Sequence, residues 1–482
     1  MNTTPNLRPR RSPEPGRPFV NRGRELRLVR DKVDIGIQGK KMPSVVTCFW
    51  GPFGMGKSWL LLELERRYRH AALKGVGSHP TIVVRLDLNR EILPALWRGK
   101  QLNREQLIRE FWKQLASQLE TKLPDLGRAS ADEWAEAFVN EVTACSAQSV
   151  TPLIMLDTVD DLVTLDELAF LWLEQHLVER LAMTDRVLFV FTSRGELRHW
   201  QRFQVRRRVD SHRLTGFDAK TAGEEVKASP AVSEVLYQHA FGHPLVTEYL
   251  GTVLEGQGVS LQEVKKVERL LEPSLVQTIL REVIDEILKT VPELLAKLAR
   301  YASVLRWVSV EPLRFLAERL GLVEPGRGDA YYLDDLIGEL QAHHLLYWNS
   351  SKSSYEPDPA LRRLLTYFLQ LDEPTRFCEA HLAAFDFHRS HLSEYPQYLA
   401  RYVPELAYHR AILDRCELPE PQPPTFQMWW EQFLSEKAPG NPEPWAELIE
   451  TLKRDEELRG LSRGDYELLY SEAQRHVAET AG

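Results

Sequence analysis

Hydrophobic residues in the first half of the chain follow two alternating patterns. Mostly apolar runs, typical of buried parallel strands, occur at 45–50, 81–86, 153–157 and 187–194, and residues 212–214 look like a fifth strand that leaves the core before Thr215-Gly216-Phe217. Between these runs, apolar residues recur at helical spacing, for example over 107–119 and 134–142, and we interpret them as faces that point into a core. Strands that alternate with helices predict an α/β domain built on a parallel five-stranded sheet.

The second half of the chain is predicted to be largely helical. Leucines and alanines recur at helical spacing over 294–340, and the apolar segment 344–348 is followed by a turn at 349–354 and by Tyr355. Helices closed by such a hairpin predict a winged helix. The remaining residues predict helices with aromatic anchors, interrupted by prolines at 419–424. Four aromatic residues of this tail either cover those helices or form an exposed docking surface: Trp429, Trp430, Phe433 and Trp445.

Composition limits the class of protein. The 482 residues suggest about three domains, and the hydrophobic fraction of 43% is typical of a soluble globular protein. No apolar run approaches the roughly 20 residues that cross a bilayer, and residues 1–18 are rich in proline and arginine, which predicts a disordered tail rather than a signal peptide. The four cysteines lie far apart, which argues against a zinc site or disulfide framework and favours a reducing, cytoplasmic compartment. A net charge of −8 gives no overall attraction to nucleic acid.

A glycine-rich stretch carries the clearest chemical signal. Residues 51–58, directly after the first predicted strand, fit the pattern G-x-x-x-x-G-K-S. Such a loop turns backbone N–H groups toward a phosphate chain, and the helix that follows adds its positive dipole end. We expect Lys57 to reach the β- and γ-phosphates of a nucleoside triphosphate and the Ser58 hydroxyl to bind Mg²⁺. The predicted nucleotide-binding residues here are Gly51, Pro52, Phe53, Gly54, Met55, Gly56, Lys57, Ser58 and Trp59.

Two further strand ends carry candidate catalytic groups. Asp157 ends a buried strand and is predicted to hold Mg²⁺, while Asp160 or Asp161 either polarises the attacking water or caps the next helix. Ser193 and Arg194 end the next strand, where the sheet edge meets a ligand, so Arg194 is interpreted as a sensor of the γ-phosphate rather than a surface arginine. The arginines that follow, over 202–213, form either a solvated face or an interface.

These motifs, in this order, resemble the STAND class of AAA+-like signal-transduction ATPases with numerous domains, over roughly residues 19–410. Phe19-Val20-Asn21-Arg22 resembles the family segment that borders the adenine, with Asn21 in place of glycine, so Arg22 is expected at the nucleotide. Gly242-His243-Pro244 resembles the G-x-P motif, whose proline packs against the nucleotide base in the family. Thr158 stands where many members carry a second acid, and Asp358 stands where the family has histidine.

The resemblance implies a division of the chain into five parts. These are a disordered tail at 1–18, an ATPase core at 19–215, a helical lid at 216–290, a winged helix at 291–371 and a helical arm at 372–482.

The resemblance also implies a function. ADP would hold these parts closed, and exchange for ATP with Mg²⁺ would release them to form a homo-oligomer that acts on an effector protein, with slow hydrolysis as the reset. Two alternatives remain: a winged-helix DNA-binding regulator, and a nucleotide-binding scaffold without hydrolysis. Nucleic acid is not expected as the main partner because 294–371 lacks a basic recognition helix, and no membrane partner is expected.

Overall fold

The computed structural model describes residues 19–20, 22–74, 81–88, 104–119, 127, 129–147, 150–323, 330–350, 352–417 and 424–481. The chain divides into two compact units, residues 1–272 and 273–482, and each is described by itself. The boundary falls inside the segment 216–290 that the sequence analysis assigns to one lid. None of the described helices is both long and apolar enough to cross a bilayer.

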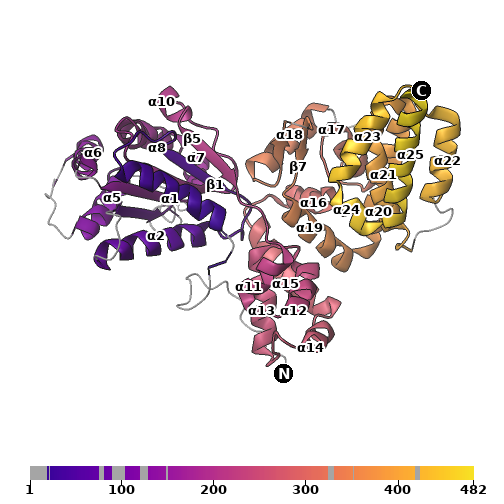
Figure 1. Ribbon diagram of the computed structural model, residues 1–482, viewed down its shortest axis with the longest axis horizontal. Helices are drawn as coiled ribbons and strands as arrows, with labels where there is room; N and C mark the ends of the chain where they lie inside the picture. Colours follow the sequence, from indigo (N-terminus) through magenta and orange to yellow (C-terminus); the bar gives the residue numbers. More distant parts are fainter. Residues whose placement is uncertain are drawn as a thin grey trace. The chain divides into compact units, whose positions relative to one another are not determined.

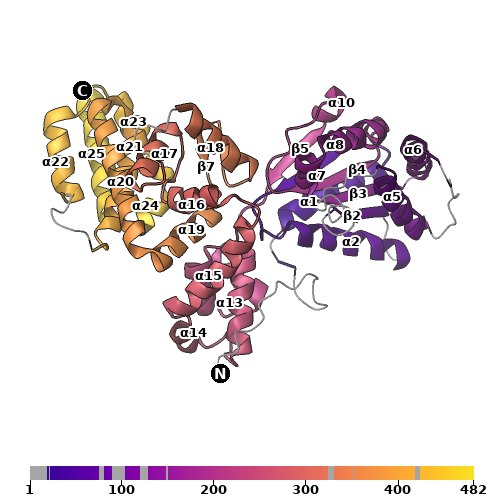
Figure 2. The same cartoon turned by 180° about the vertical axis from the view of Figure 1, so that it is seen from behind.

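The first unit is built on the expected parallel sheet, which has the strand order β2-β3-β4-β1-β5. Its strands are β1 (Val46–Trp50), β2 (Thr81–Asp87), β3 (Thr151–Asp157), β4 (Leu188–Ser193) and β5 (Val209–Arg213). Every residue of β3 and β4 is buried, because helices cover both sides of the sheet (Figures 1 and 2). This order and direction are those of an AAA+ core, which confirms the predicted fold class.

The fifth strand begins three residues before the predicted segment 212–214. Its sequence Val209-Asp210-Ser211-His212-Arg213 is mostly polar and all five residues are half-buried, since β5 lies at the edge of the sheet. Hydrophobicity alone therefore gives little signal there. Lys32 of α1, a residue that is 6% exposed, links this strand to its neighbour. Its ammonium donates to Thr47 Oγ1 on β1 at 2.7 Å and to Asp210 Oδ2 on β5 at 2.9 Å.

The helices around the sheet follow the predicted apolar stripes. They are α1 (Gly23–Ile37), α2 (Lys57–Lys74), α5 (Arg104–Leu119), α6 (Ala131–Ala147), α7 (Val159–Leu165), α8 (Glu167–Leu173), a π-helical turn at Glu174–Val178, α9 (Glu179–Ala182) and α10 (Phe203–Arg206). In α1 the residues at helical spacing, Leu26, Val29 and Val33, are buried as the pattern predicts.

Four helices after the sheet complete the first unit, and we call α11 to α14 the lid helices. They are α11 (Ala219–Val226), α12 (Pro230–Ala240), α13 (Pro244–Gly256) and α14 (Val264–Leu270). Local sequence explains their starts. The Asp218 side chain accepts from Thr221 N at the start of α11, and Ser229 does the same for Val232 N at α12. Proline occupies the first position of both α12 and α13. A backbone N–H at this position has no partner within the helix, so its absence in proline costs no hydrogen bond.

The second unit contains helices and one short hairpin. Its elements are α15 (Pro273–Leu288), α16 (Glu293–Ala302), α17 (Val310–Arg319), α18 (Ala330–Ala342), β6 (Tyr347–Asn349), β7 (Ser354–Glu356), α19 (Pro359–Asp372), α20 (Pro374–Glu394), a 3-10 turn at Pro396–Tyr398, α21 (Leu399–Leu413), α22 (Phe426–Lys437), α23 (Glu443–Arg454), α24 (Glu456–Leu461) and α25 (Arg463–Ala481). Strands β6 and β7 pair antiparallel, and Val308 bridges to Tyr355 of β7.

The C-terminal helices form one core in which α20 packs against α21, α21 against α23, and α23 against α25 (Figures 1 and 2). The four aromatic residues of the tail are buried in this core, with Trp445 at 0% and Trp430 at 1% exposure. They cover the arm, so the alternative of an exposed docking surface is wrong.

A disulfide joins Cys378 on α20 to Cys416 just beyond α21, with Cα atoms 5.9 Å apart. The expectation of no disulfide is therefore wrong for this pair. The two cysteines are 38 residues apart in sequence, and only the packing of α20 against α21 brings them together. Cys48 and Cys145 are free and buried. The sequence analysis inferred a reducing, cytoplasmic compartment from the wide spacing of the cysteines. This disulfide removes that argument.

Candidate functional site

The glycine loop lies between β1 and α2 at the carboxyl edge of the sheet, as the sequence predicts. Gly54 and Gly56 have φ angles of +79° and +82°, in the left-handed region that favours glycine. Gly56 faces open space, because a Cβ built there would have no heavy atom within 4 Å. Helix α2 begins at Lys57, so its N-terminal N–H groups lie at the loop. This backbone is suited to surround a phosphate chain.

Side chains of the loop divide between the core and the edge. Met55 is fully buried and anchors the loop, whereas Ser58 is exposed and Phe53 and Trp59 are half-buried. The Lys57 ammonium donates to Gly51 O at 2.6 Å and to Pro52 O at 2.8 Å. Backbone carbonyls of its own loop thus hold this cation beside the glycine turn, at the start of α2.

Asp157, at the end of β3, is buried with 3% exposure. The Thr192 hydroxyl of the neighbouring strand β4 donates to Asp157 Oδ1 and accepts from Thr158 N at 3.1 Å. Thr158 has a φ of +62°, unusual for a β-branched residue, and this turn directs the chain from β3 into α7. Thr192 therefore orients the carboxylate that the sequence assigns to Mg²⁺, a role that sequence reasoning did not find.

Arg194, after the end of β4, is paired with both candidate bases. Its Nε donates to Asp160 Oδ2 at 3.0 Å and its Nη2 donates to Asp161 Oδ1. Both carboxylates are largely buried in the first turn of α7, after the N-cap position Thr158. Ser193, also buried, donates from its hydroxyl to Gly195 O at 2.5 Å. The structure thus brings Asp160, Asp161 and Arg194 together at the sheet edge.

The lid helices contact the glycine loop directly. The His243 ring, fully buried, lies with Nε2 3.0 Å from Phe53 O, and Leu245 N donates to Gly54 O at 3.3 Å. A Cβ at Gly54 would lie 2.5 Å from His243 Cε1, so glycine is needed for this approach as well as for its φ. Pro244, between these two residues, is buried at the start of α13. Sequence reasoning selected Pro244 and missed His243, although a histidine inside an apolar helix start was the available signal.

Arg22 extends these contacts to the start of α1. Its Nη2 donates to Met55 O at 2.8 Å, and its guanidinium lies 5.0 Å from the centre of the Phe217 ring. Phe217 N donates in turn to Gly242 O at 2.7 Å. Burial lowers the pKa of Arg22, against an opposing effect of Glu25. Arg22, the glycine loop and the start of α13 therefore form one continuous set of contacts.

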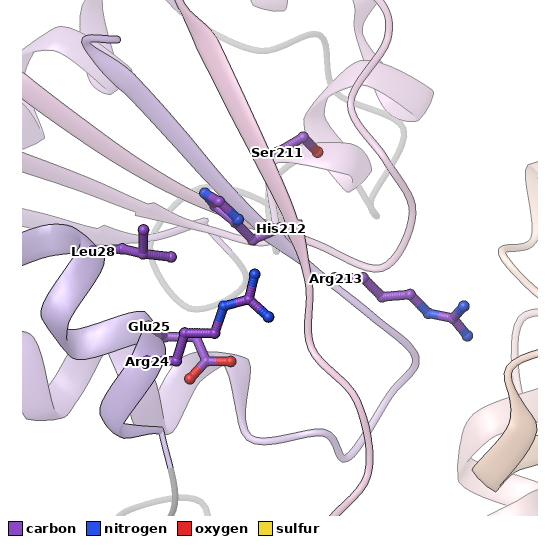
Figure 3. A pocket seen from close by; sticks show the side chains of 6 residues that line it. All are labelled: Arg24, Glu25, Leu28, Ser211, His212 and Arg213. Carbon is purple, nitrogen blue, oxygen red and sulfur yellow. The ribbon is translucent and has the colours of Figure 1, made fainter. Parts of the chain in front are cut away.

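A separate pocket of about 220 Å³ lies between α1 and β5, lined by Arg24, Glu25, Leu28, Ser211, His212 and Arg213. Figure 3 shows Arg24 and Glu25 extending from α1 and His212 on the side of β5 that faces them, whereas Arg213 points away. The residues that line it include none of 51–58. It is therefore not the phosphate site, although its α1 residues begin two positions after Arg22.

The sheet order and the glycine loop together define the class: the first unit has the fold of an AAA+ P-loop ATPase. No protein-family model matches the chain, and no curated protein matches it at a significant level. Among solved structures, it is similar to a Walker-type ATPase of Pyrococcus abyssi, with 15% identity, 72% of this chain and 96% of that chain covered, and a TM-score of 0.48.

Two other solved structures give comparable values. The ADP form of the Aeropyrum pernix ORC2 protein has 14% identity, 75% and 96% coverage and a TM-score of 0.46. The Thermotoga maritima RuvB T158V structure has 13% identity, 72% and 96% coverage and a TM-score of 0.34. These similarities are low, and the fold class rests on the sheet order and phosphate loop of this chain.

Proposed function

We propose that this protein is an ATP-binding, slowly hydrolysing molecular switch of the STAND type, in which the nucleotide controls the lid. The observation that carries the proposal is the contact of His243 with Phe53 O in the phosphate loop, at 3.0 Å. A ligand that reshapes the loop changes this contact. A switch needs a ligand to interact differently with two states, and a lid attached to the loop itself supplies such a difference.

In this proposal, the loop and α2 bind the phosphates, with Lys57 at the β- and γ-phosphates. Ser58 and Asp157 would hold Mg²⁺, which would neutralise negative charge that develops on the phosphates during hydrolysis. Asp160 or Asp161 orients the attacking water once Arg194 leaves it, and Arg194 pairs with the γ-phosphate. Arg22 and Pro244 lie toward the base. The Thr192 hydroxyl holds the Asp157 carboxylate in position.

We further propose that α16 to α18 with the β6–β7 hairpin are a winged helix that transmits the nucleotide state to a homo-oligomer and an effector protein. A DNA-reading role is less favoured because α18, the helix before the hairpin, carries Asp334, Asp335 and Glu339 and no lysine or arginine. We assign Asp358 a structural role, because its carboxylate caps the start of α19 by accepting from Ala360 N at 3.0 Å and from Leu361 N at 3.1 Å.

The test measures nucleotide affinity by calorimetry and particle mass by light scattering, with ADP, with a non-hydrolysable ATP analogue and without nucleotide. We expect both nucleotides to bind and only the ATP analogue to raise the mass. Lys57→Ala should lose nucleotide affinity while the fold survives, because the change removes a ligand-facing charge rather than core volume.

Two outcomes would contradict the proposal. Unaltered affinity in Lys57→Ala would reject the site, and nucleotide binding without any difference in mass or lid exposure would favour a scaffold. Tight duplex-DNA binding that weakens steeply with salt and requires residues 294–371 would instead support the DNA-binding regulator.

A further inference from the structure

The helix pair α20 and α21 buries a cluster of imidazole and carboxylate groups that the nucleotide site does not use. His381 and His388 are two helical turns apart on α20, and Glu405 and His409 are one turn apart on α21, so each pair lies on one face of its helix. All are buried, with exposures of 0%, 1%, 6% and 0%. His388, Glu405 and His409 offer ligand atoms that lie within 4.8 Å of one another.

Three imidazole nitrogens in this cluster have no hydrogen-bond partner among the described residues: His381 Nε2, His388 Nδ1 and His409 Nε2. Buried polar atoms are almost always paired, because each unpaired one keeps its desolvation cost. Burial lowers the pKa of His388 and His409 well below its ordinary value, and nearby charges such as Arg306 add to this for His388. Neutral imidazoles with an available lone pair are the form that binds metal ions.

Neighbouring groups orient the possible ligands. His409 Nδ1 lies 2.8 Å from His381 Nδ1, so one of the two must donate and the other accept. When His409 Nδ1 carries the proton, its Nε2 lone pair is left for a metal, the arrangement in which a second partner orients a ligating histidine. The Arg306 Nε donates to both Glu405 oxygens, at 3.0 and 3.1 Å. A carboxylate has enough lone pairs to keep one such bond and also ligate a metal.

We propose that His388, Glu405 and His409 bind one divalent transition-metal ion of the Zn²⁺ type, with His381 orienting His409 and water completing a tetrahedral site. Zinc bonds of about 2.0–2.2 Å place tetrahedral ligand atoms about 3.3–3.6 Å apart. The cluster therefore has to contract by roughly 1 Å, which rotation of the three side chains supplies.

Arginines and carboxylates surround the cluster. Arg306 pairs with Glu405 and Asp455, and Arg362 and Arg363 pair with Glu457, so three guanidiniums balance three carboxylates. Burial raises the pKa of Glu405, with Arg306 opposing this effect. A bound dication would keep that carboxylate ionised. Because its ligands come from both helices, the ion would connect α20 to α21, as the disulfide Cys378–Cys416 does near the other end of the hairpin.

The experiment uses the full chain without a histidine tag or nucleotide, stripped of metal by a chelator. Zn²⁺ is titrated by calorimetry, Co²⁺ binding is followed by visible absorption, and thermal unfolding is measured with and without Zn²⁺. We expect one ion per chain, tetrahedral cobalt bands without thiolate charge transfer, and a higher melting temperature with Zn²⁺.

Phenylalanine variants separate metal binding from packing. His388→Phe and His409→Phe keep an aromatic ring against Trp307 and Tyr408, which contact these histidines, but lose the nitrogen ligand. We expect Zn²⁺ affinity to fall at least about 100-fold. Mutating a residue that only hydrogen-bonds to a metal ligand typically lowers the affinity 10–100-fold, so a larger loss indicates a direct ligand. The control His391→Phe, on α20 and half-buried outside the cluster, should bind like the wild type.

Three results would overturn the proposal: no stoichiometric binding in the wild type, equal binding in folded ring variants, or thiolate bands that locate the ion at a cysteine. If the ring variants fail to fold, X-ray absorption of the zinc-loaded wild type decides the question. Two imidazoles and a carboxylate oxygen are then the expected ligands, and any other set rejects the site.

Discussion

Arg194 is held by two carboxylates, so its response to a nucleotide is a competition. Its side chain is 31% exposed, whereas those of Asp160 and Asp161 are 5% and 10% exposed. A γ-phosphate can offer the guanidinium two oxygens in the same bidentate geometry. The free energy that Arg194 contributes to ATP binding is therefore reduced, because its ion pairs with Asp160 and Asp161 have to break first. The two released aspartates then become available to bind water.

Arg194→Ala should weaken binding of the ATP analogue and leave the affinity for ADP within a few fold of the wild type, because ADP has no γ-phosphate. A hydrogen bond to a charged group contributes roughly 1.5–3 kcal/mol, and the lost carboxylate pairs place the expected effect near the lower limit, about tenfold. Calorimetry with both nucleotides measures it. Arg198→Ala, an exposed arginine paired with Glu196, is the matched control. An equal loss of affinity for ADP and for the ATP analogue would reject the sensor role of Arg194, but it would still be consistent with a nucleotide site here.

At the scale of elements, the lid and the phosphate loop share buried contacts. Gly242, with a φ of +76°, lets the chain pass Phe217 so closely that a Cβ would lie 2.0 Å from Phe217 O. This approach puts His243 against the loop and starts α13 at Pro244. The first turn of α13 and the loop therefore move together more readily than apart.

His243→Phe should retain nucleotide binding but uncouple α13 from it. The ring volume stays, while Phe53 O loses its partner, at a cost of about 1–3 kcal/mol to the lid contact. Hydrogen exchange of residues 241–250 with and without ADP measures the coupling, and we expect the ADP effect to shrink in this variant. His239→Phe, a half-buried histidine of α12, serves as the control. Unchanged ADP-dependent protection would show that other contacts carry the coupling.

At the scale of the whole molecule, ion pairs connect helices of the second unit that lie far apart in sequence. The second unit contains a network in which Arg306 pairs with Glu405 and Asp455. In the same network Arg362, whose side chain is 4% exposed, pairs with Glu457. Burial alone would raise the pKa of Glu457, but Arg362 and Arg306 outweigh it and lower the pKa to about 2. Stability of this unit therefore depends on pH.

Glu457→Gln should destabilise the second unit at pH 7 by roughly 1.5–3 kcal/mol, since it removes the carboxylate partner of Arg362. A carboxyl with a lowered folded pKa stabilises the fold above its ordinary value of 4.5 and loses this effect as the pH falls toward about 2. The difference between wild type and variant should thus shrink below pH 4.5. Urea unfolding followed by hydrogen exchange in α19–α25 measures it, with exposed Glu467→Gln as control. A difference that does not change with pH would contradict the assigned pKa.

The sequence by itself determined the features that depend on local pattern. Mostly apolar runs predicted β1 to β4, and the spacing of the glycines and Lys57 predicted the loop, because hydrophobic periodicity and turn residues are local properties of the sequence. Asp157 and Arg194 were predicted as site residues for the same reason, since both stand at the carboxyl end of a buried strand and parallel strands end at one edge. Polar β5, half-buried at the sheet edge, has no such pattern and was placed three residues late.

Only the tertiary structure decided which distant groups meet. Arg194 with Asp160 and Asp161, His243 with Phe53 O, and Cys378 with Cys416 are separated by 33 to 190 residues in sequence. The buried set His388, Glu405 and His409 is likewise assembled by the packing of two helices. Such pairs depend on the relative positions of whole elements, which follow from burying many apolar faces together. A local pattern reveals which face is buried, but not which partner lies against it.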